Sequence, residues 1–224
     1  FEAVRQHFSD IGHDIENTDA VYENGQARER TQILMDYANE IGGIAVGTGD
    51  LSELALGWAT YNGDHMSMYG VNAGIPKTFI QQIVRYISET SDNKELCEVL
   101  ISIVDTPISP ELLPKSGTGM AQKTEDFVGP YELHDFYLYY VVRYGFSPKK
   151  ILHMAEYAFK DRFCHDELLK WLRIFYQRFI SQQFKRSCMP DGPKIGSVSL
   201  SPRGDFSMPS DAAMSLWQKE LEKL

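Results

Sequence analysis

Apolar side chains recur every three to four positions between residues 27 and 41, a spacing that places them along one side of a helix. Asn24 stands just before this segment as a candidate N-cap, and the glycine pair at 42–43 follows its end. The pattern therefore predicts a helix over 27–41.

The next apolar run is short and continuous. Residues 44–46 read Ile-Ala-Val, which predicts a buried strand, and residues 47–50 read Gly-Thr-Gly-Asp, which predicts a turn after it. Residues 51–58 again have a helical pattern. The order helix, strand, glycine turn, helix is typical of an open α/β sheet.

The remaining pattern is helical, and it contains only one convincing central strand. It predicts helices at 76–87, 95–104, 132–144, 148–159 and 165–186, and a last helix from about Ser210. A proline-containing segment at 106–131 and a segment rich in Pro, Gly and Ser at 189–210 are expected to be loops. A loop as long as 106–131 is commonly functional, often as a lid.

The helix predicted at 165–186 has one strongly apolar face. At this spacing an aromatic stripe indicates the protein core or a subunit interface. The stripe consists of Leu168, Leu169, Leu172, Phe175, Tyr176, Phe179 and Ile180.

The composition excludes several classes of protein. The 224 residues are 43% hydrophobic with a net charge of −9, which argues against nonspecific binding of nucleic acid. No apolar run is long enough to span a membrane. The 3 cysteines lack a paired spacing and the 6 histidines lack a metal-binding motif, so we expect reduced thiols in a cytoplasmic protein and no metal held by histidine.

Charge is unevenly distributed along the chain. Residues 170–203 carry a net charge of +6, and the rest of the chain carries −15. Such a basic stretch indicates either a site for an anionic ligand such as a nucleotide or a solvated helix face with a basic loop. The basic residues are Lys170, Arg173, Arg178, Lys185, Arg186, Lys194 and Arg203.

The segment from Gly47 to Leu54 concentrates groups that could take part in chemistry. It follows a predicted strand, where open α/β sheets bind their ligands. Asp50 and Glu53 could hold Mg²⁺, or they could form a capping box for the next helix. The Walker A pattern is absent.

Several long segments in a fixed order resemble the NAD⁺ synthetase family. They are ENGQARER (23–30), GTGDLSELALGWATYNGDHMSMYGVN (47–72) and Pro76-Lys77-Thr78. AQKTEDFVGPYELHDF (121–136) and SQQFKRSCMPDGPKIGSVSLSPRGDF (181–206) resemble the glutamine-dependent branch. The resemblance implies the C-terminal portion of a Rossmann-like ATP-pyrophosphatase domain, predominantly helical with few parallel strands.

The resemblance also implies an activity. Members of this family amidate deamido-NAD⁺ to NAD⁺ through an adenylate, using ATP and Mg²⁺, with ammonia supplied from glutamine in this branch. We therefore expect deamido-NAD⁺, ATP and ammonia or glutamine as partners, a homodimer or larger homo-oligomer, and neither nucleic acid nor membrane.

The family's motifs assign roles to individual positions of this chain. Lys77 and Glu53 would be catalytic, and Glu53 would also bind the metal. Thr48, Arg28 and Ser109 would contact ATP. The contacts to deamido-NAD⁺ would come from Asn24, Glu53, Trp58, Ala59, Thr60, Tyr61, Asp64 and Lys185. Each position also has a structural alternative: Trp58 as core, Lys77 as an exposed lysine and Arg28 as an ion-pair partner on its own helix.

One departure from the family matters. The SGGxDS loop that holds the phosphates of ATP is absent, as is a glutaminase domain, and the chain opens on Phe1. We therefore expect residues 1–224 to be the C-terminal portion of the amidating domain and to be inactive alone. The alternatives are a non-catalytic module for dinucleotide binding or assembly, and a relative that uses the same chemistry on another substrate.

Overall fold

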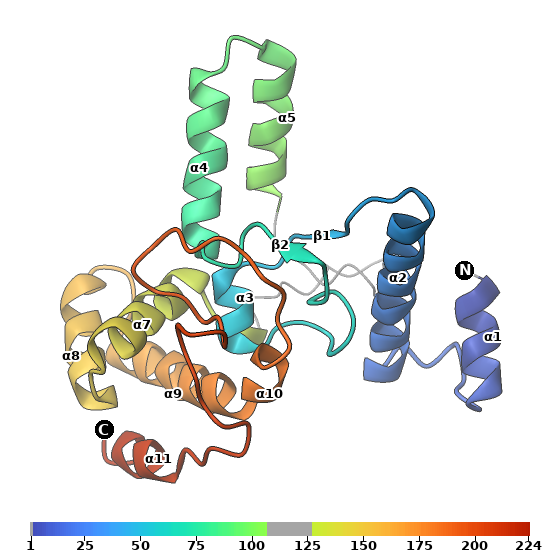
Figure 1. The fold of residues 1–224 in the computed structure, drawn as a ribbon. Coiled ribbons are helices and arrows are strands. Elements are labelled where there is room, and N and C mark those ends of the chain that lie inside the picture. The colour runs from blue at the N-terminus through green and yellow to red at the C-terminus, as the bar shows by residue number, and fades with distance from the viewer. Residues whose placement is uncertain (1, 107–126) are drawn as a thin grey trace.

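The computed structural model describes residues 2–106 and 127–224, which are mostly helical around one small parallel sheet (Figure 1). This confirms the predicted fold class. The elements are α1 Glu2–Asp10, α2 Ala20–Glu40, β1 Val46–Gly47, α3 Leu51–Leu56, β2 Tyr69–Gly70, α4 Lys77–Thr90, α5 Lys94–Asp105, α7 Tyr131–Tyr144, α8 Pro148–Ala158, α9 His165–Ser181, α10 Gln183–Arg186 and α11 Ser215–Leu221.

The main core forms where α3 packs against α7 and α9, with α8 and α11 on the outer side of α9. All seven apolar residues predicted on the face of α9 are buried, so the core interpretation of that stripe is confirmed. The helix ends at Ser181, and α10 continues the chain after Gln182. The predicted single helix at 165–186 is therefore two helices.

The sheet is smaller and more exposed than the sequence predicts. β1 and β2 are parallel, with Val46 opposite Tyr69 and Gly47 opposite Gly70. Val46 is 52% exposed, so the prediction of a buried strand at 44–46 is wrong for the described residues. Two paired strands of two residues bury little by themselves, because parallel sheets depend on covering layers.

α1 and α2 form a second, small cluster. Phe8 of α1 stacks on Tyr22 of α2, with ring centroids 5.8 Å apart. α2 begins at Ala20 and is capped by Asp19, whose carboxylate accepts from the backbone of Val21 and Tyr22. The prediction of Asn24 as the cap is therefore wrong, because Asp19 satisfies the first free N–H groups more than one turn earlier.

α4 and α5 form a hairpin that stands out from the rest of the molecule (Figure 1). The bounds predicted for both helices lie within three residues of the observed ones, whereas α11 begins at Ser215, later than predicted. Residues 189–210 contain no helix or strand, and most of the loop predicted at 106–131 lies outside the described residues. None of the described helices is both long and apolar enough to cross a membrane.

Candidate functional site

The amino end of α3 carries the first group of predicted site residues. Asp50 caps the helix by accepting from the backbone N–H of Glu53 at 2.9 Å, and the Glu53 carboxylate accepts from the backbone N–H of Asp50 at 3.3 Å. The capping box predicted for this pair is therefore present. It fixes the two carboxylates side by side.

Lys77, at the start of α4, completes this group. Its Nζ lies 2.8 Å from Asp50 Oδ2 and 2.8 Å from Glu53 Oε1, and its side chain is only 17% exposed. The alternative of an exposed lysine is therefore wrong. Burial opposes the charge of Lys77, but Asp50 and Glu53 outweigh it and raise the pKa of the ammonium.

The two carboxylates share a single cation. Burial raises the pKa of Asp50, and burial together with the charge of Asp50 raises the pKa of Glu53, although Lys77 opposes both shifts. The group therefore holds an excess of negative charge in a place with little water. Such a site favours a further cation or another hydrogen-bond donor.

Asp135 of α7 is a neighbouring carboxylate that the sequence analysis did not single out. It accepts from the hydroxyl of Ser52, and from the hydroxyl of Thr78 at 2.6 Å and its backbone N–H at 3.2 Å. Ser52 Oγ in turn accepts from the backbone N–H of Lys77 at 2.8 Å. One side chain thus ties α7 to the amino ends of α3 and α4.

The sequence did contain a signal for Asp135. Tyr131 and Leu138, which are buried, lie four residues before it and three residues after it. An acid on the apolar face of a helix needs a polar partner, so its position alone marks it as unusual. Burial raises its pKa despite the hydrogen bonds from Ser52 and Thr78.

Three cations from the basic stretch gather at the other end of α3. Arg186 donates to the carbonyls of Leu54 and Ala55, and Arg178 donates to those of Leu56 and Gly57. Lys185 donates to the carbonyls of Gly57 at 2.8 Å and Ala59 at 2.7 Å. Cations at the carboxyl end of a helix satisfy its free carbonyls and complement its dipole.

These contacts give part of the basic stretch a structural role. Arg186 is 1% exposed, and burial lowers its pKa to about 10. Lys185 is half-buried, and burial followed by the charge of Arg178 lowers its pKa. The arginines and Lys185 therefore shape the loop that begins at Gly57, which contains most of the predicted dinucleotide contacts.

The same loop is tied to α2 from the opposite side. Thr60 donates its hydroxyl to Asn24 Oδ1 at 2.8 Å, and its backbone N–H donates to Asp64 at 2.7 Å. Arg28 Nε donates to the carbonyl of Tyr61 at 3.2 Å. Within the described residues, the hydrogen bond of Arg28 is thus to the loop, where its structural alternative predicts an acid on its own helix.

Two aromatic residues of the loop differ in their accessibility. Trp58 is half-buried between Phe127, with ring centroids 6.5 Å apart, and Arg178, whose guanidinium lies 5.0 Å from the ring centroid. Tyr61 is 39% exposed and stacks on His65. Trp58 also packs against the main core, as its structural alternative predicts.

The structure therefore brings the predicted residues into two adjoining groups joined by α3. A helix of six residues is about 9 Å long, which is short enough for one extended ligand to reach both ends. Thr48 is exposed just after β1, two residues before Asp50, and so lies next to the acidic group formed by Asp50, Glu53 and Lys77. Ser109 lies outside the described residues.

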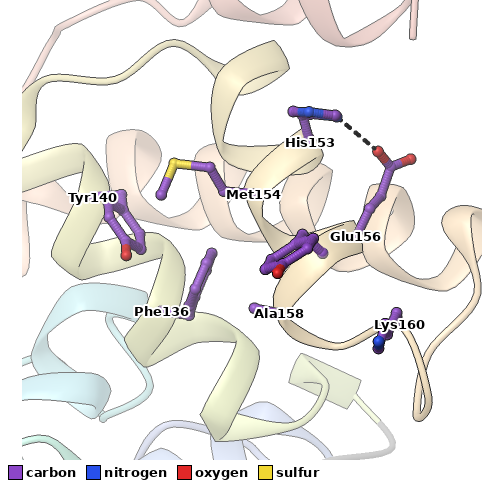
Figure 2. A pocket seen from close by; sticks show the side chains of 8 residues that line it. Phe136, Tyr140, His153, Met154, Glu156, Ala158 and Lys160 are labelled. Carbon is purple, nitrogen blue, oxygen red and sulfur yellow. Dashed lines mark ion pairs between the residues drawn. The ribbon is translucent and has the colours of Figure 1, made fainter.

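A cavity formed by described residues lies elsewhere. It has a volume of about 550 Å³ and lies between α7 and α8, lined by residues such as Phe136, Tyr140 and Met154 (Figure 2). His153 and Glu156 pair at its rim at 3.5 Å. It includes none of the predicted site residues, and its chemistry is mainly apolar, so we place the candidate site at α3.

The donors at α3 are suited to Mg²⁺ only in combination with a ligand. Within the described residues, no three Asp, Glu, His or Cys side chains form a group that could hold a metal. Glu53 and Asp50 offer hard oxygen donors and excess negative charge, which fit an ion that takes one or two carboxylates and completes its shell with phosphate and water.

Comparison with known proteins identifies relatives. A family model described as NAD synthase matches residues 1–162. The glutamine-dependent NAD(+) synthetase of Mycobacterium leprae (strain TN) is 46% identical over 225 residues, which covers 92% of this chain and 33% of the relative. The enzyme of the same description from Acinetobacter baylyi is 28% identical over 183 residues, covering 82% and 30%. The chain thus spans about a third of the length of these relatives.

A solved structure supports the fold. The chain resembles a glutamine-dependent NAD(+) synthetase from Cytophaga hutchinsonii with a TM-score of 0.73 and 19% identity, over 99% of this chain and 34% of that one. At this identity the likeness concerns the arrangement of the elements.

Proposed function

Since the chain belongs to the NAD synthase family, we propose that residues 1–224 are the C-terminal portion of the amidating domain of a glutamine-dependent NAD⁺ synthetase. The reaction would be the ATP-dependent amidation of deamido-NAD⁺ to NAD⁺, with ammonia supplied from glutamine. We also propose a cytoplasmic protein, in keeping with its free cysteines.

The observation that carries this proposal is Lys77, held by Asp50 and Glu53 where α3 and α4 begin. An ammonium group has three N–H donors, and these two carboxylates use two of them. The ammonium also lies 5.2 Å from the centroid of the Tyr131 ring, and its third N–H would donate to a phosphate oxygen when ATP binds. A compact, charged lysine in a site with little water is well suited to stabilise charge that builds up on phosphate.

The reaction would proceed in two steps. The nicotinate carboxylate attacks the α-phosphorus of ATP, which forms a C–O–P linkage and releases pyrophosphate. Ammonia then attacks the acyl carbon, the bond to AMP breaks, and the amide remains. Lys77 would offset the repulsion between the carboxylate and the phosphates, and Glu53 would keep Lys77 oriented.

Mg²⁺ would be held by Glu53 together with phosphate oxygens. When bound, it would neutralise charge on the phosphates. The remaining roles follow the two groups around α3. Thr48, Arg28 and Ser109 would contact ATP, and the dinucleotide would contact Asn24, Glu53, Trp58, Ala59, Thr60, Tyr61, Asp64 and Lys185.

Calorimetric titration of the whole chain tests the substrate. We expect deamido-NAD⁺ to bind, and Tyr61→Ala to weaken binding by about tenfold, which corresponds to the loss of one stacking contact. Tyr157→Ala is the matched control, because Tyr157 is 82% exposed on α8, away from the site. If deamido-NAD⁺ fails to bind, or if both variants bind as tightly as the unmodified chain, the assignment of the loop is wrong.

A turnover assay with ATP, deamido-NAD⁺ and ammonium tests a second part of the proposal. We expect no NAD⁺ from this chain alone, because no SGGxDS phosphate loop occurs in its sequence. Formation of NAD⁺ would show that the described residues suffice for catalysis.

Assembly is the second candidate function, and exposed apolar residues favour it. Ile33, Leu34 and Tyr37 of α2 and Ile41, which caps its carboxyl end, are each between 57% and 62% exposed. Surfaces of this kind commonly mark protein contacts. We propose a homodimer or larger homo-oligomer, which light scattering would detect; a monomer at every concentration would contradict it.

A further inference from the structure

Cys188 and His65 form a pair that lies beside the proposed dinucleotide loop and has no role in the proposed reaction. The two residues are far apart in sequence, but Cys188 Sγ lies 3.4 Å from His65 Nε2. Cys188 follows α10 and is partly exposed, whereas His65 is 6% exposed. A thiol within hydrogen-bonding distance of an imidazole nitrogen is the arrangement of an activated nucleophile.

The other ring nitrogen of His65 determines the tautomer. His65 Nδ1 lies 2.9 Å from the carbonyl oxygen of Thr60, and a carbonyl can only accept. The proton of the neutral ring is therefore on Nδ1, and Nε2 presents its lone pair to Cys188. The arrangement contains a nucleophile, a base and a third group that orients the base.

The surroundings keep this base neutral and in place. Burial lowers the pKa of His65, with the carbonyl of Thr60 and the charge of Asp64 opposing and Lys185 adding to the shift. The ring also stacks on Tyr61, with centroids 5.7 Å apart and an interplanar angle of 24°. A neutral, fixed imidazole can accept a proton near pH 7.

The other two cysteines serve as comparisons, because Cys188 contacts the carbonyl of Lys185 at 3.3 Å in addition to the imidazole of His65. Cys97 of α5, which is also partly exposed, donates to the carbonyl of Ser91 at 3.4 Å. Cys164 is exposed and caps the amino end of α9 with Glu167. They provide two internal references: a thiol of similar exposure bonded to a carbonyl, and an exposed thiol at a helix end.

We propose that Cys188 is a nucleophilic thiol activated by His65, and that it is a modification site for small uncharged electrophiles such as alkyl halides and hydroperoxides. With an alkyl halide, the thiol proton passes to His65 Nε2, the sulfur forms a bond to carbon, and halide leaves. With hydrogen peroxide, the sulfur forms a bond to oxygen, the O–O bond breaks, and the departing hydroxide becomes water. The sulfur is then oxidised to a sulfenic acid and the peroxide is reduced.

Modification would also reach the proposed site, and this consequence rests on the proposed function. Cys188 Sγ can also donate to the carbonyl of Lys185 at 3.3 Å. The side chain of Lys185 donates in turn to the carbonyls of Gly57 and Ala59. An adduct on sulfur must displace His65, which supports Thr60 and Tyr61. We therefore expect modified protein to bind deamido-NAD⁺ more weakly.

The test is site-resolved labelling of the whole chain with limiting iodoacetamide at pH 7, followed by peptide mass spectrometry. We expect Cys188 to react at least tenfold faster than Cys97, below the ~10²–10⁴ that a fully aligned enzymatic base contributes. His65→Asn keeps a donor for Thr60 but removes the base, and should slow Cys188 by about tenfold. The circular dichroism spectrum of this variant reports whether the fold is kept.

Equal rates at Cys188 and Cys97 in the unmodified chain would overturn the proposal, as would an unchanged Cys188 rate in a folded His65→Asn variant. If that variant unfolds, the ratio of the Cys188 rate to the Cys97 rate in the unmodified chain decides, and a ratio near one would overturn the proposal. Labelling needs no nucleotide, so its outcome is independent of the titration with deamido-NAD⁺.

Discussion

The ammonium of Lys77 lies 2.8 Å from the carboxylate of Glu53, and the two residues come from different helices. Both helices begin at this point, so the positive ends of α3 and α4 meet around a group of carboxylates. Asp135 holds the two helix ends together through Ser52 and Thr78. The geometry of the candidate site thus depends on a contact that neither α3 nor α4 could supply alone.

Removing the cation should leave two buried carboxylates facing each other. We predict that Lys77→Met lowers the free energy of unfolding at pH 7 by roughly 3 kcal/mol, as expected when one partner of a buried ion pair is lost. Urea titration monitored by circular dichroism would measure this change.

The pH dependence gives this prediction a second measurable sign. In Lys77→Met the pKa values of Asp50 and Glu53 lie above their values in the unfolded chain. As pH falls from 7 toward 4, the folded state therefore binds protons before the unfolded state does, and the variant regains stability. Lys94→Met, at an exposed position in the first turn of α5, is the control and should change little. If the loss of unfolding free energy in Lys77→Met were the same at every pH, Lys77 would not be the cation that Asp50 and Glu53 share.

Asp135 and Thr78 should be energetically coupled. We predict a coupling free energy of roughly 1–2 kcal/mol in a double-mutant cycle of Asp135→Ala and Thr78→Val, because Thr78→Val removes one of the donors to the part-buried Asp135 carboxylate and Asp135→Ala removes the acceptor of the Thr78 hydroxyl. The exposed pair Arg85–Asp105, 3.0 Å apart, is the control cycle and should show no measurable coupling. If the two cycles gave equal coupling free energies, the contact between Asp135 and Thr78 would stabilise the fold no more than an exposed ion pair does.

The acidic group shows what could be predicted from sequence and what could not. The spacing of Asp50 and Glu53 predicts a capping box, because that motif depends only on positions within one helix. The contact of Asp135 with Ser52 spans 83 residues, and its register depends on how α7 packs against α3. Local pattern contains no information about that packing.

Some elements of the fold could likewise be predicted from the sequence, and others could not. The apolar face of α9 is long and regular, so both the helix and its burial could be predicted. The apolar run at 44–46 was misread as buried, because three residues cannot reveal whether a covering layer is present. The start of α2 was missed because Ala20 to Gln26 contains polar residues, which hide the helical period until Ala27.

His134 should make stability depend on pH in the acid range. Its Nε2 donates to the carbonyl of Val128, its buried Nδ1 has no hydrogen-bond partner among residues 2–106 and 127–224, and burial lowers its pKa to about 4. The unfolded chain therefore binds a proton first, and stability that is fully present above pH 6.5 is lost as pH falls toward 4. The expected loss is roughly 3 kcal/mol.

His134→Gln keeps a side-chain donor but cannot titrate, so its stability curve should be flatter between pH 6.5 and 4. Some slope should remain, since burial also lowers the pKa of His65. His153→Gln is the control, because the side chain of His153 is 87% exposed. Urea midpoints at several pH values measure all three proteins, and identical slopes would refute the role of His134.

Gly57 ends α3 in the left-handed conformation, with φ of 58°, at a point where a Cβ would overlap the side chain of Gln182. Gly145 has nearly the same φ of 63° but open space around it. Gly145→Ala should therefore cost only the backbone strain, about 1 kcal/mol. Gly57→Ala should cost that amount plus the overpacking, roughly 2–4 kcal/mol in total.

A second change separates the two terms. Gln182→Gly removes the overlapping side chain, so the double variant Gly57→Ala/Gln182→Gly should recover much of the overpacking cost but none of the backbone strain. Thermal unfolding of the four variants would measure this. Because the carbonyl of Gly57 accepts from both Arg178 and Lys185, the same overlap would also move the loop that holds Tyr61. Weaker deamido-NAD⁺ binding should therefore accompany Gly57→Ala and not Gly145→Ala; equal effects of the two variants on stability and binding would show that only the backbone conformation matters.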